Sequence, residues 1–377
     1  MNGRTPRYAS LDHWRGFAAI AVLTFHGFGA VRGAGLEVHS SMVLVKSAAD
    51  LGWLGVHLFF VISGYCIAAK VDSVIAAGDG AWQFAKDRFL RIYLPYWAAC
   101  VFAAGIGVAA LPFNAGTWAS TVPSSLSSLV SNILLVEPYT GADPLLLVSW
   151  SLVFEMGFYL IVACGLALYQ RGAPGTLLYG LAYALAVGGL AGVHGGSLYA
   201  LKYWPEFLSG CAVYLALRSG RGYPRTPAFL AVPLSLAVLA AAVMPAQGAA
   251  WQTSVAAIFA VILWALHPVD AYVVGLRALK WLATIGAMSY SVYLVHQPVV
   301  GRIVNALSRV FPPDSAAYAL VQIAGWCGAL IVSWMFFKCC EMPLERVRRS
   351  LHKRRPESLV IDGTTPDMRI MSGRAGD

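Results

Sequence analysis

The sequence predicts an all-α fold: a polytopic integral membrane protein with about ten transmembrane helices and both termini in the cytoplasm. Three observations predict it, namely the composition, the lengths of the apolar runs and the distribution of basic residues. Of the 377 residues, 58% are hydrophobic and only 12% are charged, against roughly a quarter charged in an ordinary soluble domain. This composition argues against a water-soluble globule.

Ten apolar runs follow one another along the chain, several of them shorter than the ~20 residues that a helix needs to cross a ~30 Å hydrocarbon core. In order they are 14–31, 51–69, 92–111, 146–168, 177–193, 203–217, 228–244, 252–267, 281–300 and 317–337. A further stretch, 125–136, carries serines and Asn132, so we interpret it as a re-entrant or interfacial segment. Within the second run, the small residues Ser63 and Gly64 predict a close approach between helices.

Basic residues predict the orientation. The loops on one predicted side, together with the C-terminal tail, carry most of the 27 lysines and arginines, whereas the loop 112–145 carries none. Cytoplasmic loops hold the excess of Lys and Arg, so an even number of spans with cytoplasmic termini fits this asymmetry. Membrane orientation thus accounts for the net charge of +9, and we expect no nucleic acid as a partner.

The chain is expected to have two parts. Residues 1–345 would form the membrane domain, and 346–377 would form a basic, disordered cytoplasmic tail, because the end of the chain is polar and contains Gly and Pro. The seven cysteines lie mostly inside apolar runs and lack a metal-ligand spacing. We therefore expect buried thiols and no metal site.

Arg15 and His26 are ionisable residues inside the first predicted span. They are eleven residues apart, which places them on one helix face and about 16 Å apart along the axis. Asp12, one turn before Arg15, can pair with it. The structural alternative is a snorkelling arginine and a hydrogen-bonded interior histidine, but ionisable residues at membrane depth are functional candidates by default.

Glu155 and His296 are two further candidates. Along straight helices, His26 lies about 20 Å and His296 about 22 Å from the cytoplasmic surface, and Glu155 lies about 17 Å from it. A similar depth for residues from three distant parts of the chain predicts one common site. As alternatives, Glu155 could bridge two helices and His296 could hydrogen-bond a neighbour.

Arg88 and Arg91 lead into the run 92–111. They are three residues apart and share a helix face, which suits a polyanion such as a pyrophosphate. The positive-inside bias alone would also place arginines here. The sequence contains neither a glycine-rich phosphate loop nor a dinucleotide-binding fingerprint.

Six short motifs occur in order between residues 11 and 346. They are Leu11-Asp12 with Arg15-Gly16 and His26; Phe59-Phe60-Val61-Ile62-Ser63-Gly64; Arg88-x-x-Arg91-Ile92 with Pro95-Tyr96; Trp150-Ser151-Leu152 with Glu155 and Phe158-Tyr159; Ser289-Tyr290-Ser291 with Tyr293-Leu294 and His296; and Glu341-x-Pro343. Each motif alone is weak, but the ordered set resembles membrane acyltransferase family 3.

This resemblance implies a bacterial inner-membrane enzyme that O-acylates, usually O-acetylates, surface polysaccharides, lipooligosaccharides, Nod factors or macrolides, with acetyl-CoA as the usual donor. It also implies that Arg15 and His26 are the essential Arg-x10-His pair of the family, and that Arg88 and Arg91 are its Arg-x-x-Arg motif. The chain departs from the family at His57, where many members carry an acidic residue. The role of position 57 therefore stays open.

We predict an integral-membrane O-acyltransferase that takes acyl-CoA as donor substrate, binds no resident cofactor, and uses a carbohydrate or glycolipid hydroxyl as acceptor. His26 is the candidate general base or covalent acyl acceptor, and His296 is the next candidate. Arg15 would orient the donor or balance its charge, and Glu155 would orient a histidine or activate the acceptor.

Other functions also fit the sequence. A secondary transporter or glycan-succinyl exporter could use His26, Glu155 and His296 as a proton relay. A structural partner of polysaccharide assembly proteins is a third interpretation, although it does not require the intramembrane His and Arg. For an enzyme, the expected partners are the lipid bilayer, the donor, the acceptor and proteins of polysaccharide assembly.

Overall fold

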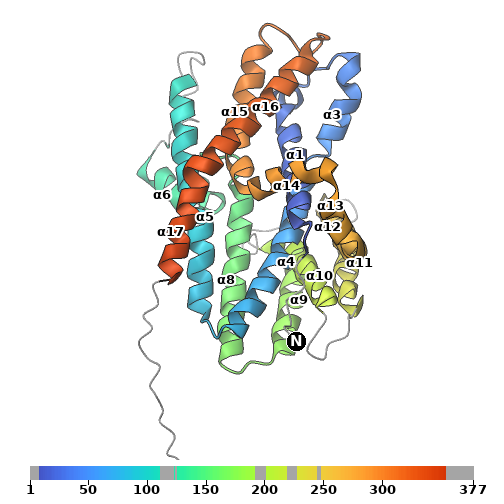
Figure 1. Ribbon diagram of the computed structural model, residues 1–377, viewed down its shortest axis with the longest axis vertical. Helices are drawn as coiled ribbons and strands as arrows, with labels where there is room; N and C mark the ends of the chain where they lie inside the picture. Colours follow the sequence, from blue (N-terminus) through green and yellow to red (C-terminus); the bar gives the residue numbers. More distant parts are fainter. Residues whose placement is uncertain are drawn as a thin grey trace, which may run out of the picture.

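The computed structural model describes residues 8–110, 123, 125–191, 201–218, 227–243 and 248–353, and within these ranges the chain is helical and has no strand. Most of the long helices run along the long axis of the molecule (Figure 1). The α-helices are α1 (Leu11–Gly27), α2 (Gly29–Ala34), α3 (Val43–Asp50), α4 (Leu54–Ala76), α5 (Ala81–Ala110), α6 (Leu126–Leu134), α7 (Glu137–Thr140), α8 (Trp150–Gln170), α9 (Gly175–Ala191), α10 (Trp204–Leu217), α11 (Ala231–Val243), α12 (Gly248–Leu266), α13 (Asp270–Gly275), α14 (Lys280–Ala287), α15 (Ser289–Leu307), α16 (Tyr318–Phe336) and α17 (Met342–Lys353). The all-α prediction is confirmed.

Five helical segments among the described residues are long and apolar enough to cross a membrane. They are Ser40–Ala76, Ala81–Ala109, Trp150–Gln170, Trp251–Gly275 and Tyr318–Leu351. Long apolar helices of this kind are the signature of a multi-pass membrane protein. The count of ten spans and the cytoplasmic location of the termini stay predictions.

The predicted span 281–300 is two helices, α14 and α15, which meet at Met288. The reason is the packing of α14 on α1 through two glycines. A Cβ atom on Gly16 would lie 2.0 Å from a backbone oxygen of α14, and one on Gly286 would lie 1.7 Å from a backbone oxygen of α1. This close contact fixes α14 against the start of α1, and α15 contacts α1 farther along, at His26. The apolar pattern of the run does not encode the break.

Helices α4 and α10 also approach closely, as the small residues of the second run predict. A Cβ atom on Gly64 would lie 1.9 Å from the backbone oxygen of Phe207, and one on Gly210 would lie 1.9 Å from that of Val61. The prediction is confirmed for Gly64. The Ser63 side chain instead points toward α8, where it hydrogen-bonds Glu155.

The segment predicted to be re-entrant or interfacial contains α6, a helix of 9 residues. Its length is about 14 Å, too short to cross the hydrocarbon core. It is held against α5 by hydrogen bonds from Tyr93 to the Leu134 carbonyl at 2.8 Å and from Tyr96 to the Asn132 carbonyl at 2.7 Å. The length agrees with the interpretation that this segment does not span.

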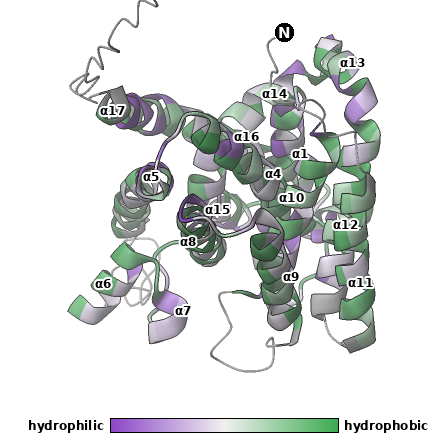
Figure 2. Ribbon diagram, turned by 90° about the horizontal axis from the view of Figure 1, so that it is seen from below, coloured by the Kyte–Doolittle hydropathy of each residue, from purple (hydrophilic) through white to green (hydrophobic). Residues whose placement is uncertain are grey.

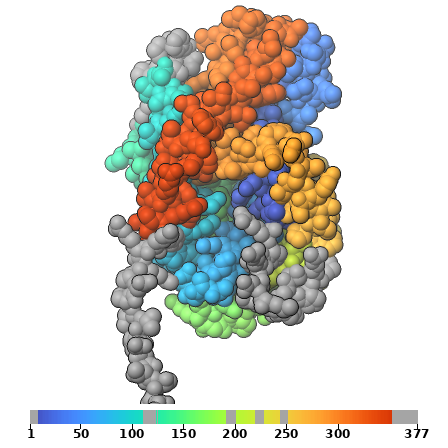
Figure 3. All heavy atoms as spheres, viewed as in Figure 1, coloured from blue at the N-terminus to red at the C-terminus, as the bar shows by residue number. Residues whose placement is uncertain are grey.

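The C-terminal part of the chain differs from the expected disordered tail. Helix α17 covers 346–353, because Arg348 binds Glu345 of the same helix at 2.6 Å and also binds Asp87 of α5. Figure 2 shows the hydrophilic α17 beside the more hydrophobic body, and Figure 3 shows it lying on the surface. The rest of the predicted tail, 354–377, lies outside the described residues.

Candidate active site

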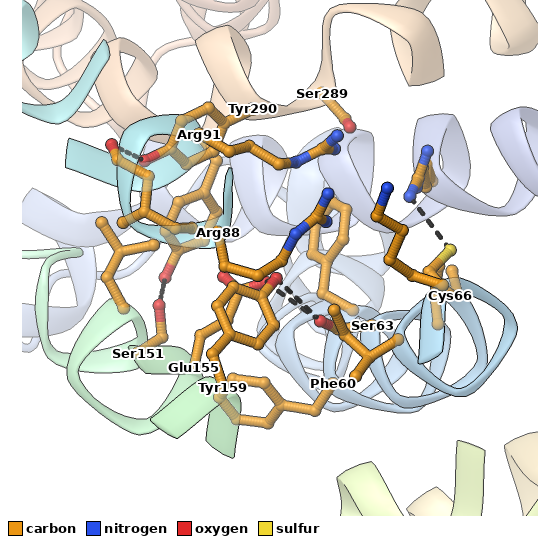
Figure 4. Close-up of a pocket in the computed structure, with 18 of the residues that line it drawn as sticks. Phe60, Ser63, Cys66, Arg88, Arg91, Ser151, Glu155, Tyr159, Ser289 and Tyr290 are labelled. Atoms are coloured by element: carbon orange, nitrogen blue, oxygen red, sulfur yellow. Dashed lines mark hydrogen bonds between the residues drawn. The ribbon is translucent and has the colours of Figure 1, made fainter. Parts of the chain in front are cut away.

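A cavity of about 420 Å³ lies among α1, α4, α5, α8, α14 and α15. Four basic side chains line it, with two carboxylates and three tyrosines: Arg15, Lys70, Arg88, Arg91, Glu155, Glu341, Tyr159, Tyr290 and Tyr293. We call it the basic cavity. Figure 4 shows Arg88 and Arg91 reaching into it from α5. With more cationic than anionic groups, the basic cavity favours an anionic ligand.

Arg88 is held by an acidic neighbour and keeps unused hydrogen-bonding capacity. Its guanidinium binds Asp87, and Asp87 also binds Arg348 of α17. The Nε of Arg88 is buried and has no hydrogen-bond partner within the described part of the chain. A buried donor without a partner costs free energy. A ligand with anionic oxygens would satisfy it, and Arg91 beside it offers a second guanidinium for such oxygens.

Hydroxyl and amide groups hold the two carboxylates of the basic cavity in place. Glu155 accepts hydrogen bonds from Ser63 Oγ at 3.0 Å and from the Tyr159 hydroxyl. Glu341 accepts from the backbone N of Ser291 at 3.1 Å and from its hydroxyl. These bonds orient Glu155 in the cavity that also holds the arginines.

Arg15 also lies in the basic cavity. Its Nη1 lies 3.3 Å from Asp12 Oδ1, so the predicted pair between these residues is confirmed. Its Nη2 lies 3.3 Å from the Cys66 sulfur of α4. Arg15 thus adds its charge to the cavity that contains Arg88 and Arg91.

His26 and His296 form a contact in a different part of the molecule. The His26 Nδ1 lies 3.2 Å from the His296 Nε2. The Nδ1 of each ring also lies near the carbonyl oxygen one turn earlier in its own helix, Val22 for His26 at 2.9 Å and Val292 for His296 at 2.7 Å. The ring centroids are 4.9 Å apart.

These contacts assign the protons of the histidine pair. A carbonyl oxygen only accepts, so both Nδ1 atoms carry hydrogen. The His296 Nε2 then accepts from the His26 Nδ1–H, which uses both nitrogens of His296. His26 keeps Nε2 as a lone pair for another group. The Val22 carbonyl and His296 together fix the tautomer of His26, and His26 has the nitrogen that a general base or nucleophile needs.

A second cavity of about 210 Å³ adjoins His26, and we call it the histidine cavity. Its lining comes from the end of α1 and from residues at or near the starts of α4, α8, α10, α12 and α15: Val22, Phe25, His26, Trp53, Val56, His57, Val148, Trp150, Tyr203, Gln252 and Tyr293.

Val56 and Tyr293 line both cavities. The Tyr293 hydroxyl lies 2.5 Å from Ser151 Oγ and donates to the Val148 carbonyl at 3.0 Å. These bonds hold the tyrosine at the boundary. The two cavities therefore share a wall formed by two side chains.

The structure groups the predicted site residues in two sets. His26 and His296 lie together, whereas Glu155 lies with Arg15, Arg88 and Arg91 in the basic cavity. The expected convergence of Glu155 with the two histidines is thus not found. Depth along a helix does not say which way a side chain points, and the break at Met288 invalidates a depth measured along one straight helix.

Glu206 is a residue that the sequence interpretation missed, and it gives His57 a partner. The His57 Nδ1 lies 2.8 Å from both carboxylate oxygens of Glu206, and each side chain is only 2% exposed. The signal was present, because Glu206 is a carboxylate within the apolar run 203–217. Glu155 is a candidate because it is an ionisable residue inside an apolar run, and Glu206 meets the same criterion.

Comparisons with known proteins agree with the family that the sequence motifs indicate. A profile of the family described as an acyltransferase domain matches residues 8–338. The peptidoglycan O-acetyltransferase OatA of Listeria monocytogenes serovar 1/2a is 25% identical over 91% of this chain. The alignment covers 57% of the Listeria protein, so the chain spans little more than half the length of this relative. No solved structure matches the chain.

Proposed function

The chain belongs to membrane acyltransferase family 3 and is an acyltransferase, and from this premise we propose that it transfers an acyl group, most simply acetyl, from acyl-CoA to a hydroxyl of a carbohydrate or glycolipid. The observation that carries the proposal is the shared wall of the two cavities. An anion-binding cavity and a histidine with an available Nε2 lie on opposite sides of Val56 and Tyr293.

The donor would occupy the basic cavity. Coenzyme A is a polyanion, and its phosphates would bind Arg88 and Arg91, with Arg15 and Lys70 adding positive charge. The thioester would then point toward Val56 and Tyr293. Phosphate contacts remote from the reacting carbonyl mainly supply binding energy for the donor.

The transfer would occur beside His26. Its Nε2 removes the proton of the acceptor hydroxyl, and the hydroxyl oxygen attacks the acyl carbon. The new C–O bond forms, the C–S bond breaks, and CoA leaves as a thiolate that takes up the proton. In the covalent variant, Nε2 itself accepts the acyl group before the hydroxyl does. In both variants His296 holds the ring in the required tautomer.

The acceptor and the membrane are also part of the proposal. The name of the Listeria relative refers to peptidoglycan, so a cell-envelope glycan is the first acceptor to test here. The location proposed is the bacterial inner membrane, with ten spans and cytoplasmic termini. Reporter fusions after Ser120 and after Arg355 should give opposite signals, and identical signals would refute this topology.

The decisive experiment uses purified protein with radiolabelled acetyl-CoA and envelope glycan from a strain that lacks the gene. We expect label to appear on the glycan as a base-labile ester with wild-type protein and not with the His26→Ala variant. The break at Met288 is a feature also found in transporters. Transport of acetyl groups or succinyl glycans without any labelled ester would favour that alternative.

A further inference from the structure

His57 and Glu206 form a buried pair that the acyl-transfer steps above leave unused. The carboxylate receives the hydrogen of His57 Nδ1 at 2.8 Å, so the ring is held in one orientation and Nε2 remains for another group. The pair joins α4 and α10, the two helices whose backbones Gly64 and Gly210 bring into contact. Its geometry is therefore fixed by the fold.

One member of this pair, His57, faces a cavity, whereas Glu206 is buried behind it. His57 lines the histidine cavity together with His26. Burying ionisable partners is costly, and a purely structural contact could be replaced by apolar packing at little loss. An imidazole nitrogen directed by a carboxylate, on the lining of a cavity that also holds the reactive histidine, is suited to bind a substrate group.

Aromatic rings surround this imidazole. The centroid of the His57 ring lies 5.1 Å from that of Trp53 and 5.9 Å from that of Tyr203, and Trp150 lies 5.6 Å from Tyr203. Flat apolar walls with a few placed polar groups are the usual form of a small-molecule site. Such walls fit the apolar faces of a sugar ring, and the two histidines and Gln252 can bind its hydroxyls.

The size of the cavity limits the ligand. At about 210 Å³, it is smaller than the 300–1,000 Å³ of typical drug-sized sites. It therefore suits one ring of a glycan, with the remainder of the polymer outside.

We propose that the histidine cavity is the acceptor subsite, that it takes one sugar ring, and that His57 binds a second hydroxyl of the ring whose reacting hydroxyl faces His26. Glu206 is the positioning residue that orients His57. This inference rests on the proposed function. It assigns a ligand class to a cavity and a role to the position where the chain departs from the family motif.

The test compares three variants in the labelled assay, with the concentration of isolated envelope glycan varied. In His57→Leu the acceptor KM should rise about 10-fold, the size of one lost hydrogen bond of ~1.4 kcal/mol, while acetyl-CoA affinity stays at the wild-type value. Glu206→Gln should show a smaller rise, because the amide oxygen still accepts from Nδ1. The exchange variant His57→Glu with Glu206→His keeps a carboxylate–imidazole pair between the two helices but removes the imidazole from the cavity, so it should resemble His57→Leu.

Asp72→Asn is the matched control. Asp72 bridges the same two helices through Tyr214 at 2.7 Å, and it lines neither cavity. This variant should keep the wild-type KM for the glycan.

Two results would overturn the inference, and a third would show that the proposed function itself is wrong. Full recovery of the KM in the exchange variant would make the pair purely structural and overturn the inference. An unchanged KM in His57→Leu would also overturn it. Failure of the proposed function is distinguishable, because wild type and His26→Ala would then both leave the glycan unlabelled.

Discussion

The basic cavity and the histidine cavity share Val56 and Tyr293 but differ in the charge of their lining. The basic cavity contains four cationic side chains and is lined mainly by α4, with further residues from α5, α8 and the start of α15. The histidine cavity contains two imidazoles and several aromatic rings, and its lining includes the end of α1 and the start of α4. The difference separates two tasks: permanent charge suits the binding of an anionic donor, and a neutral nitrogen suits proton transfer.

Among these variants, a change at His26 in the histidine cavity should have the largest effect on the transfer rate. Replacing His26 by Ala should lower the transfer rate by ~10² to 10⁴, the usual contribution of a general base, while acetyl-CoA affinity stays at the wild-type value. The measurement is the rate of ester formation at saturating donor, alongside equilibrium binding of acetyl-CoA.

His13→Ala is the control for this prediction. His13 lies on the same helix, is 8% exposed and lines neither cavity. We expect near wild-type transfer from it. If His26→Ala is present at normal membrane levels and transfers at the wild-type rate, the assignment of the base is wrong and His296 becomes the next candidate.

The double variant Arg88→Gln with Arg91→Gln should weaken the binding of acetyl-CoA more than it slows the transfer. Charge-assisted hydrogen bonds contribute about 1.5–3 kcal/mol each, so losing one from each arginine should raise the Kd for acetyl-CoA by roughly 100-fold. Turnover at saturating donor should change less. Lysine at both positions should restore only part of the affinity, because it lacks the bidentate fork.

Lys86→Gln removes a charge from the same helix outside the basic cavity, and we expect it to leave the donor Kd unchanged. An unaltered Kd in the double glutamine variant would mean that Arg88 and Arg91 serve only the orientation of the chain in the membrane.

Tyr293→Phe tests the shared wall. The change removes the bonds from the hydroxyl to Ser151 and Val148, each worth roughly 0.5–1.5 kcal/mol. Transfer should fall by about 2- to 10-fold, with the donor Kd unchanged, because the phosphate contacts are remote. Ser151→Ala removes the first bond from the other side and should have a similar, non-additive effect. Equal activity of wild type and both variants would show that these bonds do not set the position of the wall.

Asp12→Asn should give the smallest effect. The ion pair with Arg15 is partly exposed, with 25% and 48% of the two side chains accessible, and such pairs contribute about 0–1 kcal/mol. The donor KM should therefore change by no more than a few fold. Arg15→Gln should raise it further, since Arg15 lines the basic cavity. If the two variants raised the donor KM equally, the expected difference would be wrong, and Asp12 would be the residue that holds Arg15 in its orientation.

The sequence predicted more of the fold than of the site. It predicted the helical class, the Asp12–Arg15 pair and the close helix approach at Gly64, because these depend on local composition and spacing. It did not predict the break at Met288, which depends on the contact of Gly286 with a helix far away in the chain.

The sequence by itself determined which side chains are candidates for the chemistry, since charged and imidazole groups in apolar runs stand out by the free-energy cost of burying them. Only the tertiary structure decided how they are grouped. In it, His26 contacts His296, Glu155 lies in the cavity of the arginines, and His57 pairs with Glu206. The physical reason is that burial cost is a property of one residue, whereas a site depends on the rotation of each helix about its axis, and packing against distant neighbours sets that rotation.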